Sequence, residues 1–435
     1  MAGWKRAQRR SAALLLAVAL LLCACGAGET VPDAPQESTA APSPLPSPTP
    51  EPTPEPLPEP VPQPPAQQLA LHLDTSYEDA LVLLDDNYWT DTSFSAGTTI
   101  TLRAEQPIAS LYIVFGTYPG TWLLTVGSRI DECGLDGFLH EYVSVPKPSE
   151  ELRLSFPYED VTIRDIYAFT EGYLPSFVQT WQNLDGEADI LLFSPHSDDE
   201  LLFFGGLIPY YSAVCGLKVQ VVYMTTNYQT TFSNYRFRPH ESLNGLWVAG
   251  THYYPVTNMV PDYECANVWQ ARRYYGEDQF TEFMVEQIRR FKPLVAVTLA
   301  EDGEYGHGTH VLTALSLEEA VKLAADPEQF PESAEQYGVW DTPKTYLHRY
   351  DRYDESTWLN YEMPAAELGW RTPFQVAQAA YREHITQQQW VSFYVYGTGH
   401  TFDSHRFGLY RSLVGPDEEK NDLLEHVSRE MFEQG

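Results

Sequence analysis

The chain has 435 residues, of which 60 are Asp or Glu and 27 are Lys or Arg, so its formal net charge is −33 at pH 7. An acidic surface of this size repels phosphate backbones, which excludes nucleic acid as an expected partner. The cysteines include no Cys-x-x-Cys pair, which excludes a structural zinc site of that kind.

Residues 1–24 are typical of a signal peptide. Four basic residues precede an apolar run from Ala12 to Leu22, which is shorter than the roughly 20 residues needed to span a bilayer. The segment Leu22-Cys23-Ala24-Cys25-Gly26 resembles the lipobox of bacterial lipoproteins, and this resemblance implies lipid attachment at Cys25. We therefore expect an extracytoplasmic protein that its lipid alone anchors to the outer face of the bacterial cell membrane. An ordinary cleaved signal peptide is the alternative.

Residues 25–67 predict a linker between this anchor and the folded part. The segment is rich in Pro, Glu, Ser and Thr and is too poor in large apolar residues to form a core. Proline at this density favours the extended polyproline II conformation, so the linker reaches on the order of 100 Å.

Residues 68–175 predict an all-β sandwich. Apolar and polar residues alternate in short stretches separated by turn residues, which is typical of strands with one buried face. The pattern is similar to a galactose-binding-like jelly roll. Trp89, Tyr112, Tyr118 and Trp122 are candidates for stacking on sugar rings, with a place in the core as the alternative. The expected strands are 99–102, 110–115, 122–126, 138–145, 152–156 and 161–169.

Residues 185–435 predict a second domain of a different class, in which strands and helices alternate. This alternation implies a Rossmann-like parallel sheet with helices on both faces, and ligands bind such sheets at the carboxyl ends of the strands. The expected strands are 190–193, 219–224 and 294–299, and the expected helices are 201–214, 241–248, 280–291 and a long helix that ends at Ala324.

Two His-rich segments directly follow expected strands: His196-Ser197-Asp198-Asp199-Glu200 and His307-Gly308-Thr309-His310. Two histidines and one carboxylate leave coordination positions open, as a catalytic metal requires, and His196, Asp199 and His310 supply such a set. Asp198 points away from Asp199 and is the candidate general base. His307 is placed to stabilise an oxyanion. The alternative is that these acids only stabilise the start of the next helix.

These two segments resemble the signature motifs of the PIG-L (LmbE-like) N-acetylglucosaminyl deacetylase family. The segment Arg238-Pro239-His240-Glu241 resembles the family's Arg-x-x-Glu helix, and His384-Ile385-Thr386-Gln387 resembles a structural element near the family's C-terminal end. The resemblance implies substrate contacts by Arg238 and Tyr305. Asp262 is a candidate for binding a sugar hydroxyl, with a solvated loop acid as the alternative. Ser197 and Thr309 depart from the family pattern, and we expect Thr309 to affect the rate and the pH optimum more than the type of reaction.

The resemblance implies metal-dependent removal of an acetyl group from an N-acetylglucosamine-containing glycan or glycoconjugate. The expected cofactor is Zn²⁺, with Fe²⁺ as the alternative, and the expected partner is an N-acetylated sugar or glycan. Three other functions stay open. They are a non-catalytic glycan-binding lipoprotein, a metal-dependent amidase acting on a non-sugar substrate, and a non-haem iron oxygenase, whose metal is also held by two histidines and a carboxylate.

Overall fold

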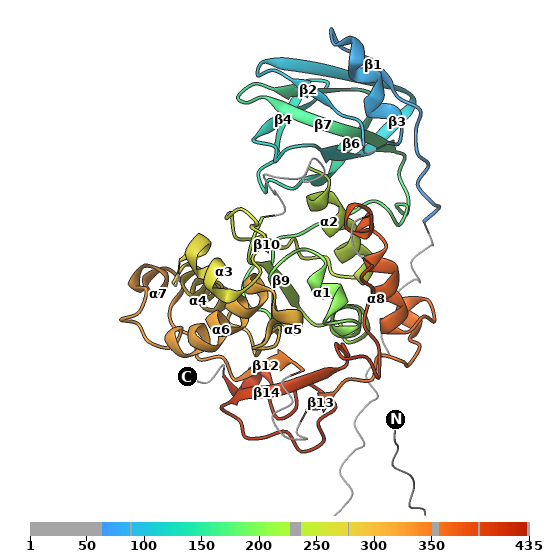
Figure 1. Cartoon of the computed structure of the whole chain (residues 1–435). Helices are drawn as coiled ribbons and strands as arrows, with labels where there is room; N and C mark the ends of the chain where they lie inside the picture. The colour runs from blue at the N-terminus through green and yellow to red at the C-terminus, as the bar shows by residue number, and fades with distance from the viewer. Residues whose placement is uncertain are drawn as a thin grey trace, which may run out of the picture. The chain divides into compact units, whose positions relative to one another are not determined.

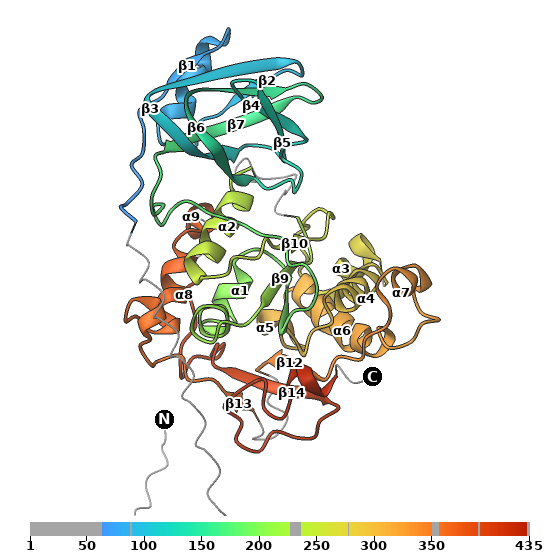
Figure 2. The same cartoon turned by 180° about the vertical axis from the view of Figure 1, so that it is seen from behind.

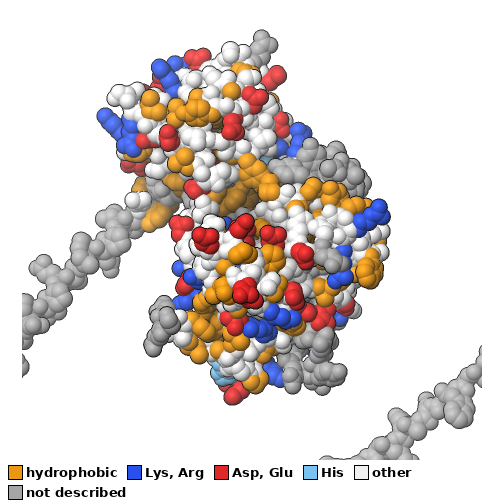
Figure 3. All heavy atoms as spheres, turned by 90° about the vertical axis from the view of Figure 1, so that its left-hand side faces the viewer, with side chains coloured by type: hydrophobic (Ala, Val, Ile, Leu, Met, Phe, Trp, Pro, Cys, Tyr) orange, Lys and Arg blue, Asp and Glu red, His pale blue; other side chains and the backbone are white. Residues whose placement is uncertain are grey.

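The computed structural model describes residues 63–87, 89–226, 236–276, 278–349, 356–389 and 392–432. The predicted signal peptide, Cys25 and all of the predicted linker before residue 63 lie outside the described residues. Within the described ranges, no helix combines the length and apolar character that a membrane span requires. Acidic side chains are spread over the face of the molecule drawn in Figure 3.

The N-terminal part of the described chain is built on an antiparallel sheet. Its strands follow the order β2-β7-β3-β6-β4-β5, with β1 paired to β3, and a short 3-10 helix, η1 (Glu78–Leu84), lies between β1 and β2. The strands are β1 (His72–Asp74), β2 (Thr92–Phe94), β3 (Thr98–Phe115), β4 (Trp122–Val126), β5 (Arg129–Cys133), β6 (His140–Phe156) and β7 (Val161–Phe169).

Two of these strands are longer than the sequence predicts. β3 joins the two expected strands 99–102 and 110–115, and β6 joins 138–145 and 152–156. The pairing of β3 with β6 shifts register on both sides of Ile108, so Pro107 falls at an irregularity of the ladder, where a missing N–H is tolerated. The turn-like residues of the sequence are therefore bulges within continuous strands.

Most of the aromatic residues proposed for sugar stacking are not available on the surface. Trp122 is fully buried and Tyr112 is nearly so, so for both the core alternative is correct. The ring of Trp89 packs at 4.2 Å from the ring of Phe237. Tyr118 alone among these four is exposed, at 42%.

The second sheet has the order β10-β9-β8-β11-β12-β14-β13. Its first five strands pair in parallel, and β14 and β13 pair antiparallel at the other edge. The three strands expected from the sequence are β8, β9 and β11. The strands are β8 (Ile190–Ser194), β9 (Val219–Tyr223), β10 (Val256–Thr257), β11 (Val295–Thr298), β12 (Lys344–His348), β13 (Thr357–Trp358) and β14 (Arg406–Ser412).

Helices cover both faces of this sheet, as Figures 1 and 2 show from opposite sides. Ile190 and Leu192 pack into the core formed with α2 and α8, whereas Leu191 and Phe193 pack into the core formed with α4 and α6. This burial on both faces explains why the strand reads as a continuous apolar run. The longer helices are α2 (Arg238–Ala249), α3 (Val268–Tyr275), α4 (Gln279–Phe291), α6 (Gly308–Leu323), α7 (Pro331–Tyr337) and α8 (Pro373–Tyr381).

The expected helix over residues 201–214 is wrong as a single element. α1 (Asp199–Leu202) ends early, and a π-helical segment, η2 (Pro209–Val214), follows after a turn. Gly205 has φ +50, and a Cβ there would overlap the side chain of Ser404, so the close approach of this segment requires glycine. The remaining short helices are α5 (Gly303–Gly306), η3 (Ala366–Leu368), α9 (Ile385–Gln388) and η4 (Arg429–Met431).

Both sheets belong to one compact unit that begins at Pro62. The identification of the first sheet with a galactose-binding-like sandwich, and of the second with a Rossmann-like fold, stays a prediction.

Candidate metal centre

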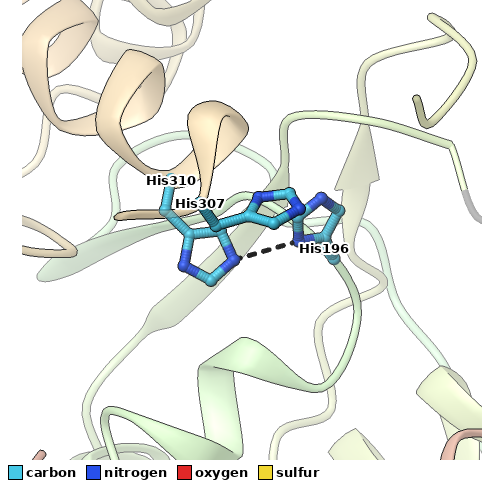
Figure 4. A group of neighbouring side chains, drawn as sticks. All are labelled: His196, His307 and His310. Atoms are coloured by element: carbon cyan, nitrogen blue, oxygen red, sulfur yellow. Dashed lines mark hydrogen bonds between the residues drawn. The ribbon is translucent and has the colours of Figure 1, made fainter. Parts of the chain in front are cut away.

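The two His-rich segments meet at one edge of the parallel sheet. β8 ends at Ser194 and leads into the first segment, and β11 ends at Thr298 and leads toward the second. β8 and β11 are paired neighbours and run parallel, so the loops after them emerge side by side. Figure 4 shows His196, His307 and His310 with their rings gathered together.

The turn that carries the first segment is held by hydroxyl groups and by one carboxylate. Ser194 Oγ donates to the carbonyl of His196 at 2.8 Å, and Thr225 Oγ1 donates to the carbonyl of the intervening residue, Pro195, at 3.0 Å. Asp198 has φ +125, which is rare for a residue with a side chain, and its N–H donates to Glu200 Oε2 at 2.8 Å. Glu200 therefore stabilises the turn, whose backbone is strained at Asp198.

Three atoms of His196, Asp199 and His310 form a small triangle. Asp199 Oδ2 lies 2.9 Å from His196 Nδ1 and 3.2 Å from His310 Nε2, and the two nitrogens are 3.2 Å apart. In a tetrahedral site with bonds of about 2.0–2.1 Å, two ligand atoms lie about 3.3 Å apart. Two imidazole nitrogens and a carboxylate oxygen at these separations fit a divalent metal such as zinc.

His307 lies beside this triangle. One nitrogen from each of His196, His307 and His310 falls in a group whose members are all within 4.8 Å of one another. Burial lowers the pKa of His307 to about 3, so its ring is neutral at pH 7. Its Nδ1 is buried and has no hydrogen-bond partner among the described residues. The arrangement is compatible with the predicted oxyanion role and also with a role as a further ligand.

The charges at the centre are strongly coupled. Although burial lowers the pKa of His196, the carboxylates of Asp262 and Asp199 raise it well above its usual value. Burial alone would raise the pKa of Asp199, but His310 and His196 lower it instead. Asp199 is therefore ionised at pH 7, as a metal ligand must be.

Asp198 is nearly fully buried, and its carboxylate pairs with the guanidinium of Arg238. Burial raises the pKa of the Asp198 carboxyl to about 7, whereas Arg238 acts in the opposite direction. Arg238 Nη2 lies 3.7 Å from Asp198 Oδ2 and donates to the carbonyl of Ser197 at 2.8 Å. Arg238 thus contacts the predicted base directly, and its predicted contact with substrate stays untested.

Asp262 and Tyr305 also lie at the centre. Asp262 Oδ1 is 3.3 Å from His196 Nε2 and its side chain is only 5% exposed, so the alternative of a solvated loop acid is wrong. Tyr305 is 48% exposed, and its ring centroid lies 5.3 Å from that of His310. Tyr305 is therefore the one predicted substrate residue that presents a large part of its surface to solvent.

The helix α2, which begins at Arg238, is held from the C-terminal part of the chain. Glu241 accepts hydrogen bonds from the N–H of Thr386 at 2.8 Å and from its hydroxyl at 2.6 Å. His384 is fully buried, and a Cβ at Gly245 would meet its Nε2 at 2.9 Å. The predicted structural role of the 384–387 segment agrees with these contacts.

The same first turn of α2 is held from the antiparallel sheet. Arg164 Nε donates to His240 Nε2 at 3.1 Å, which leaves Nδ1 of His240 to donate to His140 Nε2 at 2.8 Å. His140 Nδ1 then faces the hydroxyl of Tyr112 at 3.0 Å. Each hydrogen bond determines which nitrogen of the next ring carries the proton, so both imidazoles are neutral. Residues of β6 and β7 therefore hold the turn that carries Arg238.

Two buried residues at this centre have no assigned role in the sequence reading. Glu304 lies behind His310, and His348, at the end of β12, lies behind Glu304. The acidic residues before His307 were visible in the sequence, but nothing there distinguishes Glu304 from Glu301 or Asp302. His348 gave no signal, because it lies 38 residues beyond His310 in a strand that the pattern did not reveal.

Residues 191–321 match the sequence profile of the family described as PIG-L, GlcNAc-PI de-N-acetylase. The resemblance predicted from the two His-rich motifs is therefore confirmed for this segment, which is less than a third of the chain.

Curated relatives are similar over short stretches. The chain is 42% identical over 69 residues to 1D-myo-inositol 2-acetamido-2-deoxy-alpha-D-glucopyranoside deacetylase 2 of Saccharopolyspora erythraea, which covers 16% of this chain and 24% of that protein. It is 30% identical over 128 residues to the corresponding deacetylase of Thermomonospora curvata, which covers 25% of this chain and 43% of that protein. The chain thus spans less than half the length of these two relatives.

Among solved structures, the chain is similar to N,N'-diacetylchitobiose deacetylase from Pyrococcus horikoshii. The two are 18% identical with a TM-score of 0.34, and the alignment covers 47% of this chain and 70% of that one.

Proposed function

We propose that this protein is a metal-dependent hydrolase that removes the acetyl group from an N-acetylated amino sugar, in an N-acetylglucosamine-containing glycan or glycoconjugate. The observation that carries the proposal is the triangle of His196, Asp199 and His310, with a buried second carboxylate, Asp198, directly beside it. The match of residues 191–321 to a family described as a de-N-acetylase supports the bond that is cleaved.

Zinc is the proposed metal, with ferrous iron as the alternative, because both accept two imidazoles and a carboxylate. When bound, such an ion polarises a carbonyl oxygen and lowers the pKa of water. The ligand triangle leaves room for this chemistry, since three protein ligands do not complete a tetrahedral shell.

The other residues have separate roles in the proposal. Asp198 takes a proton from the attacking water and delivers it to the leaving nitrogen. His307, whose ring is neutral and whose Nδ1 has no hydrogen-bond partner among the described residues, donates to the oxyanion that forms on the acetyl carbonyl. Arg238 offsets the charge of Asp198, and Tyr305 presents its ring to the substrate from the solvent side.

The fold assignments that accompany this function are also proposals. We infer a Rossmann-like deacetylase domain over residues 185–435, preceded by a galactose-binding-like β-sandwich over residues 68–175. The hydrogen-bond pairing of the two sheets, parallel in the second and antiparallel in the first, supports these assignments.

The proposed function is tested on a panel of N-acetylated mono- and oligosaccharides incubated with the full chain. Zinc content is measured on the same sample. We expect acetate release together with a loss of one acetyl group from at least one substrate, and about one equivalent of bound metal. A protein that binds no metal and releases no acetate contradicts the proposal and favours a glycan-binding protein without catalytic activity. Acetate or another acid released only from non-sugar amides favours the amidase alternative.

We also propose that Cys25 is the site of lipid attachment and that the protein stands at the outer face of the cell membrane. The lipobox-like sequence before Gly26 supports this. Cys25→Ala is expected to release the protein into the medium or to leave it as unprocessed precursor, as judged by mass spectrometry of the membrane fraction. A mature product of Cys25→Ala that still carries lipid contradicts attachment at this residue.

A further inference from the structure

A fully buried carboxylate, Glu304, lies directly behind His310. Its Oε2 atom is 3.5 Å from Nδ1 of His310, and both side chains have no exposed surface. Neither of these two atoms forms a hydrogen bond with another group among the described residues, so each has only the other nearby. A buried N–H and a buried carboxylate oxygen that face each other are complementary, because each otherwise lacks the partner that burial demands.

The two nitrogens of His310 have different surroundings. Nε2 faces Asp199 Oδ2 and His196 Nδ1, so it is the atom in the ligand triangle. A neutral imidazole that offers the lone pair of Nε2 carries its proton on Nδ1. Glu304 Oε2, 3.5 Å from Nδ1, is the carboxylate oxygen that faces this proton, and an acceptor at this place favours one tautomer and one orientation of the ring.

The other oxygen of Glu304 is anchored independently. Oε1 accepts hydrogen bonds from the N–H of Ala300 at 3.1 Å and from Nδ1 of His348 at 2.8 Å. His348 is itself held, because its Nε2 lies 3.2 Å from the carbonyl oxygen of Asp403. The carboxylate therefore has a fixed position that does not depend on His310.

The backbone places Glu304 there at a cost. Glu304 has φ +60 and ψ −66, and its N–H is capped by Asp302 Oδ1 at 3.1 Å. The preceding Gly303 lies so close to the first turn of α6 that a Cβ would meet Val311 Cγ2 at 2.7 Å. A side-chain-bearing residue in this conformation persists only where the surrounding contacts over-determine it, and such strain is common at functional sites.

His196 has a similar arrangement. Its Nδ1 is in the ligand triangle, and its Nε2 lies 3.3 Å from the buried carboxylate of Asp262. Both histidines of the triangle thus have a buried carboxylate at the nitrogen that points away from it.

We propose that Glu304 is a positioning residue for the metal centre, which orients His310 through its Nδ1 and is itself held by His348. The inference rests on the proposed function, since it takes His310 as a metal ligand. It adds two residues, from α5 and β12, to a centre whose two His-rich motifs lie at the starts of α1 and α6.

Zinc affinity of the full chain, measured by competition with a chromophoric chelator, tests this proposal. Glu304→Gln keeps the shape but leaves one acceptor oxygen for two rings, and Glu304→Gly removes the carboxylate while relieving the strain at φ +60. We expect both variants to bind zinc roughly 10- to 100-fold more weakly than the wild type. Glu319→Gln is the matched control, because Glu319 lies on the same helix as His310 but its side chain is 57% exposed and pairs with Lys322. We expect the zinc affinity of this variant to equal that of the wild type.

Two further measurements separate positioning from folding. The visible spectrum of the cobalt-substituted protein reports ligand geometry, so we expect its bands to shift in Glu304→Gln and in His348→Gln but not in Glu319→Gln. Melting of the metal-free variants shows whether they fold. Folded Glu304 variants with wild-type zinc affinity and an unchanged cobalt spectrum overturn the proposal. A wild-type chain that binds no zinc overturns the proposed function instead, so the two failures are distinguishable.

Discussion

Replacing Asp198 by asparagine separates the proposed base from the metal ligands. Asp198 Oδ2 is outside the triangle and pairs with Arg238 at 3.7 Å, so its loss leaves all three ligand atoms in place. Asparagine is also one of the few residues that tolerates positive φ, whereas alanine at φ +125 adds backbone strain. We therefore expect Asp198→Asn to fold and to bind zinc as the wild type does.

The expected effects on activity and stability have opposite signs. A positioned general base contributes about 10²- to 10⁴-fold in rate, which is about 3–5 kcal/mol of barrier, so acetate release should fall by that factor. Burial raises the pKa of the Asp198 carboxyl from 3.8 to about 7. The folded state thus favours the protonated form, and ionisation costs up to about 4 kcal/mol above pH 7 and nothing below pH 4. Metal-free Asp198→Asn should be more stable than metal-free wild type at pH 8, and the difference should vanish toward pH 4.

The assay combines single-substrate acetate release, zinc content and chelator-treated thermal melts at pH 4, 6 and 8. Glu200→Gln is the matched control, since Glu200 is the adjacent buried carboxyl and burial raises its pKa to about 8, so the exchange is between two neutral groups at pH 7. We expect this control to keep most of the activity. Turnover of Asp198→Asn within a factor of a few of the wild type, with zinc retained, would refute the assignment of Asp198 as the base.

Three further predictions follow from the contacts. His310→Ala removes a ligand atom and should lose both bound zinc and acetate release. His307→Ala should keep most of the zinc and lose acetate release. If metal analysis shows that the two variants lose zinc to the same extent, His307 is a ligand. Burial lowers the pKa of His140 to about 3, so the unfolded chain takes up a proton first as the pH falls below about 6.5, and stability should decline from there toward pH 3. Calorimetry should show a weaker decline in His140→Gln, and an identical pH profile would contradict a neutral buried ring. A Cβ at Gly308 would overlap the carbonyl oxygen of Asn267, so Gly308→Ala should cost about 1–3 kcal/mol and lower Tm, and an unchanged melt would contradict this packing.

Local patterns predicted the elements around the centre well. The observed bounds agree within a residue or two with the expected ranges for the strands β8, β9 and β11 and the helices α4 and α6. Buried strands and amphipathic helices have characteristic local patterns of apolar residues, which the sequence shows directly. The failures have their origin in contacts between segments that are distant in the sequence. The expected strands 99–102 and 110–115 are one strand, because the pairing with β6 accommodates Pro107 at an irregularity. Gly205 follows the end of α1, and its close contact with Ser404, almost 200 residues away, leaves no room for a side chain.

The sequence by itself determined which residues carry the proposed chemistry. His196, Asp199 and His310 follow strands that local pattern reveals, and parallel strands deliver the loops after them to one edge. The spacing of each motif is a local property, so the ligand set could be named without coordinates.

Only the tertiary structure decided which side chains contact and orient those residues. Glu304 and His348 come from α5 and β12, and Asp262 comes from the loop that precedes α3, so their contacts with the two histidines depend on packing between distant segments. The same holds for Arg164 and His140, which hold the turn of Arg238 from β7 and β6. A buried hydrogen bond between residues far apart in the chain leaves no periodic trace in either segment. The two groups can be recognised as partners only in the folded structure. Burial removes water from both groups, so each can then form a hydrogen bond only with the other.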